Sequence, residues 1–142
     1  MEKKNFYKKI LIISSNFYPE ISNNLQDGVL NVLKSENIDF ELKSINGSLE
    51  IPFFLEKYKK QYLGYIIIGC IIKGETDHYE VVKNITFPQI YKVAYENILP
   101  LSSALLTVEN YSQALERSDT KKKNLGGFAA KTCLNLIKKI NE

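Results

Sequence analysis

The only histidine of the chain, His78, stands shortly after an unbroken apolar segment. That segment spans residues 65–72 and is bounded by Gly64 and Lys73. An apolar run of this length is typical of a strand that is buried on both faces. Because a neutral imidazole can accept and donate a proton near neutral pH, His78 is a candidate for acid–base chemistry. Taken alone, a histidine at such a position is more often an ordinary surface residue.

The residues between this strand and His78 predict a helix that begins with an anion site. Thr76 and Asp77 are favourable N-cap residues, and the side chain of Glu80 can reach back to the first turn. The free amides of a helix N-terminus attract anions such as phosphate, and the helix dipole disfavours the charged form of His78. Since ligands of open α/β sheets bind outside the carboxyl ends of the strands, the pattern predicts a ligand site here.

Other residues that could bind a ligand follow other predicted strands. Phe17 follows an apolar segment at residues 9–14, and Glu50 follows an alternating segment at residues 38–42. Each has a simpler interpretation: Phe17 as a hydrophobic staple, Glu50 as a helix cap, and Arg117 as an exposed cation at a helix end. The joint placement of an aromatic ring, a carboxylate and an imidazole at strand ends favours one shared site.

Strands and helices alternate along the chain. Apolar patterns predict strands at residues 9–14, 38–42, 65–72 and 101–107, and helices at residues 19–36, 52–58, about 78–98, 109–117 and 126–140. The strand at 38–42 alternates with charged residues, so it is expected at an edge of the sheet. Pro88 removes a backbone hydrogen bond, which predicts a kink or break near Thr86–Phe87.

This alternation predicts a parallel sheet with helices on both faces. Right-handed crossovers reduce the choices to a flavodoxin-like three-layer α/β/α sandwich with a four-stranded parallel sheet. The 142 residues fit a single domain spanning residues 1–142. Nine tyrosines and seven phenylalanines, several on helices that could face outward, favour a homo-oligomer.

The composition argues against several classes of protein. A net charge of +3, spread evenly, does not indicate nucleic-acid binding, and no apolar run approaches the roughly 20 residues of a membrane span. No glycine-rich dinucleotide motif, phosphate-loop lysine or zinc motif is present, so no cofactor and no metal are predicted. Cys70 and Cys133 lack disulfide spacing, and the charged N-terminus does not look secretory, so a reduced, cytoplasmic protein is expected.

Four segments, in order, resemble the lumazine synthase family. Residues 69–79 (GCIIKGETDHY) resemble the loop after the family's third strand, and residues 47–52 (GSLEIP) resemble its G-A/S-F-E-I/L-P segment. Residues 106–117 are similar to its T-x-E/D-x-x-x-Q-A-x-x-R segment, and residues 16–18 (NFY) to its R-F-N turn. The resemblance implies an enzyme that condenses 5-amino-6-(D-ribitylamino)uracil with L-3,4-dihydroxy-2-butanone 4-phosphate. The product, 6,7-dimethyl-8-ribityllumazine, belongs to the penultimate step of riboflavin biosynthesis, and no cofactor takes part.

The resemblance also implies a role for each residue of the site. For the pyrimidine substrate, Phe17 would stack on the ring, Ser48 and Glu50 would hold the ribityl chain, and backbone groups of Ile71 and Ile72 would bind the uracil. For the second substrate, Gly74, Glu75 and Thr76 would hold the phosphate together with Arg117 of a neighbouring subunit, and His78 would transfer protons. The implied assembly is a pentamer with sites between adjacent subunits, or a 60-subunit shell of twelve pentamers.

Three substrate-site positions depart from the family's pattern. Leu49 and Ser103 stand where the family usually has phenylalanine, and Leu125 stands where it usually has lysine. These departures motivate an alternative, a lumazine-binding, riboflavin-binding or shell-forming protein on the same scaffold with reduced or lost catalysis. An unrelated flavodoxin-like binding module would require the four matched segments to arise by chance.

Overall fold

The computed structural model describes residues 8–74 and 79–142. Its parallel strands are β1 (Lys9–Ser15), β2 (Asp39–Ile45), β3 (Gly64–Ile72) and β4 (Leu101–Val108), in the order β2-β1-β3-β4. The predicted four-stranded parallel sheet is confirmed in the described residues. Strand β2 lies at an edge, as its alternating pattern predicts, and most of its residues are half-buried or exposed.

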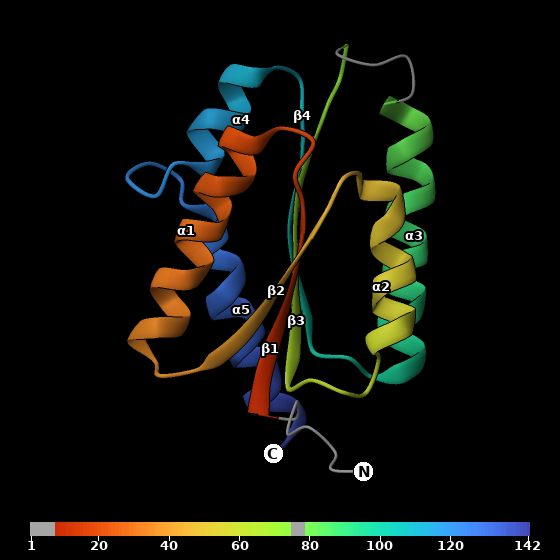
Figure 1. Ribbon diagram of the computed structural model, residues 1–142, viewed down its shortest axis with the longest axis vertical. Helices are drawn as coiled ribbons and strands as arrows, with labels where there is room; N and C mark the ends of the chain where they lie inside the picture. Colours follow the sequence, from red (N-terminus) through yellow and green to blue (C-terminus); the bar gives the residue numbers. More distant parts are fainter. Residues whose placement is uncertain (1–7, 75–78) are drawn as a thin grey trace.

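Helices cover both faces of the sheet (Figure 1). On one face lie α1 (Pro19–Ser35), α4 (Tyr111–Ser118) and α5 (Leu125–Ile140), and on the other lie α2 (Ile51–Tyr58) and α3 (Tyr79–Asn97). A short 3₁₀ turn, η2 (Ser48–Glu50), connects β2 to α2. This arrangement is the predicted flavodoxin-like three-layer α/β/α sandwich.

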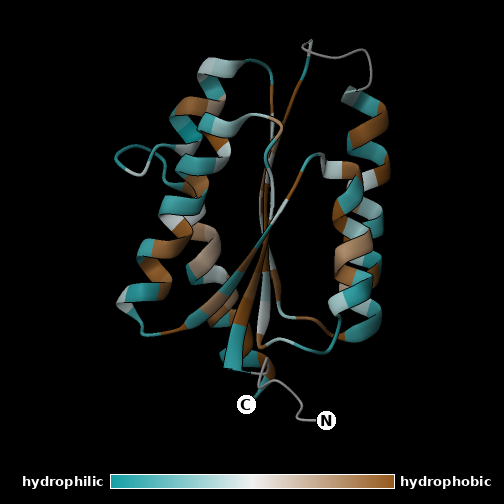
Figure 2. Cartoon of the chain, viewed as in Figure 1, coloured by the Kyte–Doolittle hydropathy of each residue, from teal (hydrophilic) through white to brown (hydrophobic). Residues whose placement is uncertain are grey.

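The strands contribute alternate residues to two hydrophobic cores. In β1, Ile10 and Ile12 join the core under α1 and α5, whereas Leu11 and Ile13 join the core under α2 and α3. Figure 2 shows hydrophobic residues along the central strands, and both hydrophilic and hydrophobic residues on the helices. Because both faces are covered, a central strand such as β3 is buried at every position, and its sequence is an unbroken apolar run.

Of the kink or break predicted near Thr86–Phe87, the break does not occur, because α3 continues from Tyr79 to Asn97 with Pro88 inside it. Pro88 has no amide hydrogen, so the carbonyl of Asn84, four residues earlier, loses its helical partner. Pro88 and Asn84 are both exposed, so water can bind that carbonyl. The lost hydrogen bond therefore costs little at this position, and the helix is not interrupted.

Thr86 buries a hydroxyl that has no hydrogen-bond partner in the described part of the chain. The residue is fully buried on α3, and an unsatisfied buried polar group costs roughly 1–3 kcal/mol. Valine has nearly the same shape without the hydroxyl, so we expect Thr86→Val to raise the free energy of unfolding by about 1 kcal/mol in urea denaturation. Thr132→Val, at an exposed position of α5, should stay within about 0.5 kcal/mol of the wild type. A Thr86→Val protein less stable than the wild type would contradict this prediction.

Helices α1 and α5 pack with their backbones in close contact. A Cβ atom at Gly126 would lie 2.2 Å from the carbonyl oxygen of Leu25, and one at Gly28 would lie 2.5 Å from Oδ1 of Asn124. Asn124 adopts a left-handed conformation with φ of 49°, and its side-chain oxygen accepts a hydrogen bond from the amide of Gly127 at 3.2 Å. Because Gly28 and Gly126 have no side chains, and because Asn124 caps the turn, α5 can begin directly against α1.

Candidate functional site

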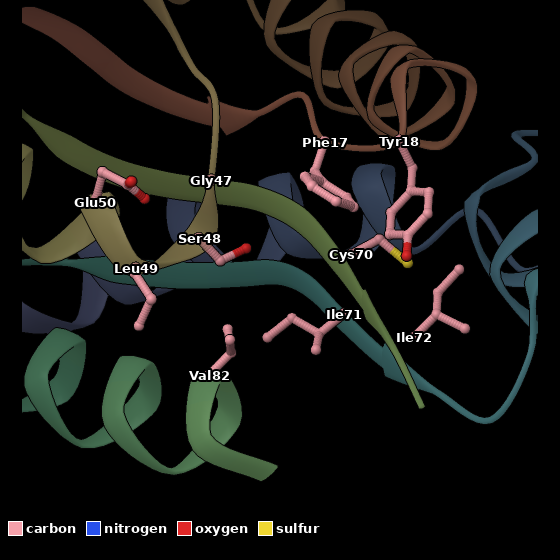
Figure 3. Close-up of a pocket in the computed structure, with 10 residues that line it drawn as sticks. All are labelled: Phe17, Tyr18, Gly47, Ser48, Leu49, Glu50, Cys70, Ile71, Ile72 and Val82. Carbon is pink, nitrogen blue, oxygen red and sulfur yellow. The ribbon is translucent and has the colours of Figure 1, made fainter. Parts of the chain in front are cut away.

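A cavity of about 220 Å³ lies at the carboxyl ends of β1 and β3 (Figure 3). Four separate parts of the chain line it. These are Phe17 and Tyr18 after β1, residues 47–50 after β2, residues 70–72 at the end of β3, and Val82 in the first turns of α3. The predicted ligand site at the carboxyl edge of the sheet therefore coincides with a cavity.

The strand order explains why the cavity forms here. The chain leaves β1 toward α1 on one face of the sheet and leaves β3 toward α3 on the other face, although β1 and β3 are neighbours. Diverging connections leave a crevice between adjacent strands, which is where α/β folds bind their ligands. The cavity accordingly takes residues from both cores, with Cys70 and Ile72 on the α1 side and Ile71 on the α3 side.

The end of β3 presents backbone groups to this cavity. The pairing of β1 with β3 ends at Ser14 and Ile68, whereas the pairing of β3 with β4 continues to Ile72 and Val108. Within the described residues, the edge of residues 69–72 that faces β1 therefore has no strand partner. Backbone amides and carbonyls at such an edge can bind the polar edge of a planar heterocycle.

Small residues form the floor between β1, β3 and η2. The hydroxyl of Ser48 donates to that of Ser15 at 3.5 Å, and both residues are buried. A Cβ atom at Gly69 would lie 3.3 Å from the Ser48 hydroxyl and 2.7 Å from Leu105. The absence of a side chain at Gly69 thus leaves room for a buried hydroxyl under the cavity.

Glu50 points its carboxylate back over Gly47. A Cβ atom at Gly47 would lie 2.9 Å from Oε2 of Glu50, so any other residue there would displace the carboxylate. Glu50 is the N-cap residue of α2, but its side chain makes no capping hydrogen bond. The simpler interpretation of Glu50 as a helix cap is therefore not supported, and its exposed carboxylate remains available at the cavity.

Phe17 projects into the cavity and does not form a hydrophobic staple (Figure 3). Its side chain is 66% exposed. A staple would pack it against the fourth residue of α1, but that residue is Ser22, which is polar and bonds to the backbone of the first turn. Its ring instead contacts the ring of Tyr18, with centroids 5.0 Å apart and planes at 78°.

The structure brings together six of the residues expected to bind substrate. They are Phe17, Ser48, Leu49, Glu50, Ile71 and Ile72. Tyr18, Gly47, Cys70 and Val82 also line the cavity and are absent from the predicted set. Cys70 was recoverable from strand alternation, because it lies two residues before Ile72 and so faces the same way. Val82 required the packing of α3, which no local pattern reveals.

Cys70 contributes an apolar wall and not a nucleophile. Its side chain is buried, and burial raises the pKa of the Cys70 thiol to about 12. Only a thiolate is an effective nucleophile, so this thiol stays unreactive at neutral pH. Cys133, on α5, is likewise buried, and burial raises the pKa of its thiol to about 12.

Four other predicted residues lie outside the cavity of a single chain. Gly74 follows β3 with φ of +83° and is exposed. Ser103 is half-buried on β4, where its hydroxyl accepts a hydrogen bond from the amide of Leu105 at 3.1 Å. Arg117 is half-buried in the last turn of α4, and Leu125 packs against the α1-side core at the start of α5.

Three further predicted residues, Glu75, Thr76 and His78, lie outside the described residues. The described part of the chain contains no group of three or more metal-ligating side chains. Within the same residues, no helix is long and apolar enough to cross a membrane.

Comparisons with known proteins show the family of the chain. The family model of 6,7-dimethyl-8-ribityllumazine synthase matches residues 7–141. The 6,7-dimethyl-8-ribityllumazine synthase of Bartonella tribocorum is 37% identical over 131 residues, which cover 90% of this chain and 87% of that protein. The synthase of Bartonella bacilliformis is 36% identical over 140 residues, covering 96% and 92%. The chain therefore belongs to the 6,7-dimethyl-8-ribityllumazine synthase family.

Proposed function

We propose that this protein is a 6,7-dimethyl-8-ribityllumazine synthase. It condenses 5-amino-6-(D-ribitylamino)uracil with L-3,4-dihydroxy-2-butanone 4-phosphate and releases phosphate and water. Family membership supports this proposal. The observation that carries it in this chain is the cavity at β1 and β3. It gathers an exposed aromatic ring, a carboxylate, a hydroxyl and a strand edge that has no strand partner among the described residues.

The cavity suits the pyrimidine substrate. The exposed ring of Phe17 offers a stacking surface, and the free edge of β3 near Ile71 and Ile72 offers backbone partners for the uracil. Ser48 and Glu50, on the adjacent turn, would bind the hydroxyls of the ribityl chain. Leu49, also at the cavity, supplies an apolar contact in place of an aromatic ring.

The second substrate would bind beyond the end of β3. Gly74, Glu75 and Thr76 would hold its phosphate, with Arg117 of a neighbouring subunit as the paired cation, because a guanidinium binds such oxyanions in a forked geometry. His78 would transfer protons during imine formation and phosphate loss, and no cofactor is needed. Holding both reactants in place could contribute roughly 7–11 kcal/mol to lowering the barrier.

We further propose that the active unit is a homo-oligomer in the cytoplasm. Ser103, Arg117 and Leu125 lie outside the cavity of their own chain, so an adjacent subunit would bring them to a site. The assembly would be a pentamer or a 60-subunit shell, and mass measurement in solution distinguishes the two. A protein that remains monomeric at all concentrations would contradict this part of the proposal.

The direct test mixes the purified protein with both substrates and follows the lumazine chromophore. Formation of 6,7-dimethyl-8-ribityllumazine is expected. Absence of product at high concentrations of both substrates would contradict the proposed activity. Tight binding of lumazine or riboflavin without turnover would instead identify a protein that has lost catalysis, an alternative that the family relationship does not favour.

Phe17→Ala is expected to raise the KM for the ribitylaminouracil substrate by roughly 5- to 150-fold. The range corresponds to loss of aromatic stacking on a base, about 1–3 kcal/mol. Because Phe17 is 66% exposed, the melting temperature should hardly change. Phe128→Ala removes a phenylalanine that is 68% exposed on α5 and does not line the cavity, so its KM should equal that of the wild type. Equal KM values for both variants would argue against stacking on Phe17.

A further inference from the structure

Phe17 is largely exposed, so its orientation in the cavity needs a support. A phenylalanine ring in solvent samples several rotamers, and ordering it on binding would weaken affinity. Its ring meets that of Tyr18 edge to face, with centroids 5.0 Å apart and planes at 78°. Figure 3 shows both side chains projecting into the cavity from the same loop.

Tyr18 is itself held by two helices. It is half-buried and packs against the core on the α1 side of the sheet. Its ring also meets the ring of Tyr111, the first residue of α4, at 6.3 Å and 63°. Burial and the nearby carboxylate of Glu20, in the first turn of α1, raise the pKa of the Tyr111 hydroxyl. A continuous series of contacts thus runs from α1 and α4, through Tyr111 and Tyr18, to the ring of Phe17.

We propose that Tyr18 is a positioning residue whose ring fixes Phe17 in the orientation that stacks on the pyrimidine substrate. This inference rests on the proposed function, because it takes the stacked ring to be that of the ribitylaminouracil. Edge-to-face contacts between aromatic rings have a preferred geometry, so the ring of Tyr18 limits the rotation of its neighbour. A ring that is already oriented binds a flat heterocycle without the cost of being ordered.

Tyr18→Leu tests the inference, because leucine retains apolar bulk against the core but removes the ring. The KM for 5-amino-6-(D-ribitylamino)uracil, and its Kd from calorimetric titration, should rise about 2- to 12-fold, the worth of one aromatic pair. The kcat should stay within about twofold, because the inference gives Tyr18 a role in binding and the proposed function assigns proton transfer to His78. Tyr18→Phe keeps the ring and should restore wild-type values.

Two controls separate positioning from general destabilisation. Tyr58→Leu breaks a similar edge-to-face pair with Tyr62, at 6.1 Å and 82°, near the opposite end of the sheet, and should leave KM and Kd unchanged. In a Phe17→Ala background, adding Tyr18→Leu should raise KM and Kd no further, because Tyr18 acts through the ring that is already missing. A merely structural role for Tyr18 would produce the same added loss in both backgrounds.

Unchanged KM and Kd for Tyr18→Leu, or full additivity with Phe17→Ala, would overturn the inference and leave the proposed activity intact. If the wild type binds the pyrimidine but forms no lumazine, the proposed activity fails, and the Kd values still decide the role of Tyr18. If the wild type binds no pyrimidine, both fail. Should Tyr18→Leu not fold, Tyr111→Leu removes the support one residue further away, and the same rise in Kd is expected.

Discussion

Replacing His78 with alanine is expected to lower kcat about 10²–10⁴-fold while KM changes little. A positioned imidazole contributes a factor of this size through general acid–base catalysis. Imine formation and phosphate loss both require proton transfer, and His78 is the only histidine in the sequence. The residue lies outside the described structure, so the prediction rests on its place in the sequence, just after the strand that ends at the cavity.

The control for His78 is Glu80→Gln, an exposed position in the first turn of α3 whose carboxylate pairs weakly with Lys83 at 3.6 Å. Its kcat should stay within about twofold of the wild type, since exposed ion pairs have little effect. Added imidazole should restore part of the activity of His78→Ala and none in the control. A His78→Ala enzyme that keeps nearly full kcat would show that another group transfers the proton.

Gly126→Ala is expected to destabilise the protein by roughly 1–3 kcal/mol, which lowers Tm by roughly 4–12 °C. The added Cβ atom would lie 2.2 Å from the carbonyl oxygen of Leu25, so backbone of α1 or α5 would have to move. In an ordinary helix, the same substitution stabilises by about 0.5–1 kcal/mol, so the sign of the change is diagnostic. Thermal unfolding followed by circular dichroism measures it.

Asn135→Ala is the matched control for Gly126, because it lies on the same helix at an exposed position. Its free energy of unfolding should stay within about 0.5 kcal/mol of the wild type. A Gly126→Ala protein that melts at or above the wild-type temperature would show that α1 and α5 are not in close backbone contact in solution.

The strands were predictable because the sheet is covered on both faces. Burial on both faces demands apolar residues at consecutive positions, so β3 (Gly64–Ile72) matches the run predicted at 65–72. The end of α1 was also predictable, because asparagine is one of the residues that commonly follow a helix in the left-handed conformation. Asn37 adopts this conformation, with φ of 56°. Pro88 does not break α3, because a lost hydrogen bond is tolerated where water can reach the free carbonyl, and the sequence does not reveal that exposure.

The candidate site was predictable only in part. All parallel strands end at one edge, so residues after β1, β2 and β3 could be expected to meet there. Which residues from each face of the sheet line the cavity depends on how the helices pack. The sequence pattern does not reveal this packing, so Val82 was not predicted. Tyr18 was missed for a different reason: its neighbour Phe17 carried the aromatic signal, and only the ring geometry shows that the two side chains act together.

The position of β1 in the strand order affects how the chain folds while it is being synthesised. β1 is made first, yet it lies between β2 and β3, and its pairing with β3 requires residues 64–68. At translation rates of 5–20 residues per second, the apolar residues Ile10–Ile13 wait roughly 3–10 s for that partner. Meanwhile one edge of the nascent strand is open to pairing with other chains. Slower initiation of translation, or a chaperone that binds unfolded chains, should therefore improve the yield of folded protein. Either one keeps nascent chains with an unpaired β1 from meeting one another.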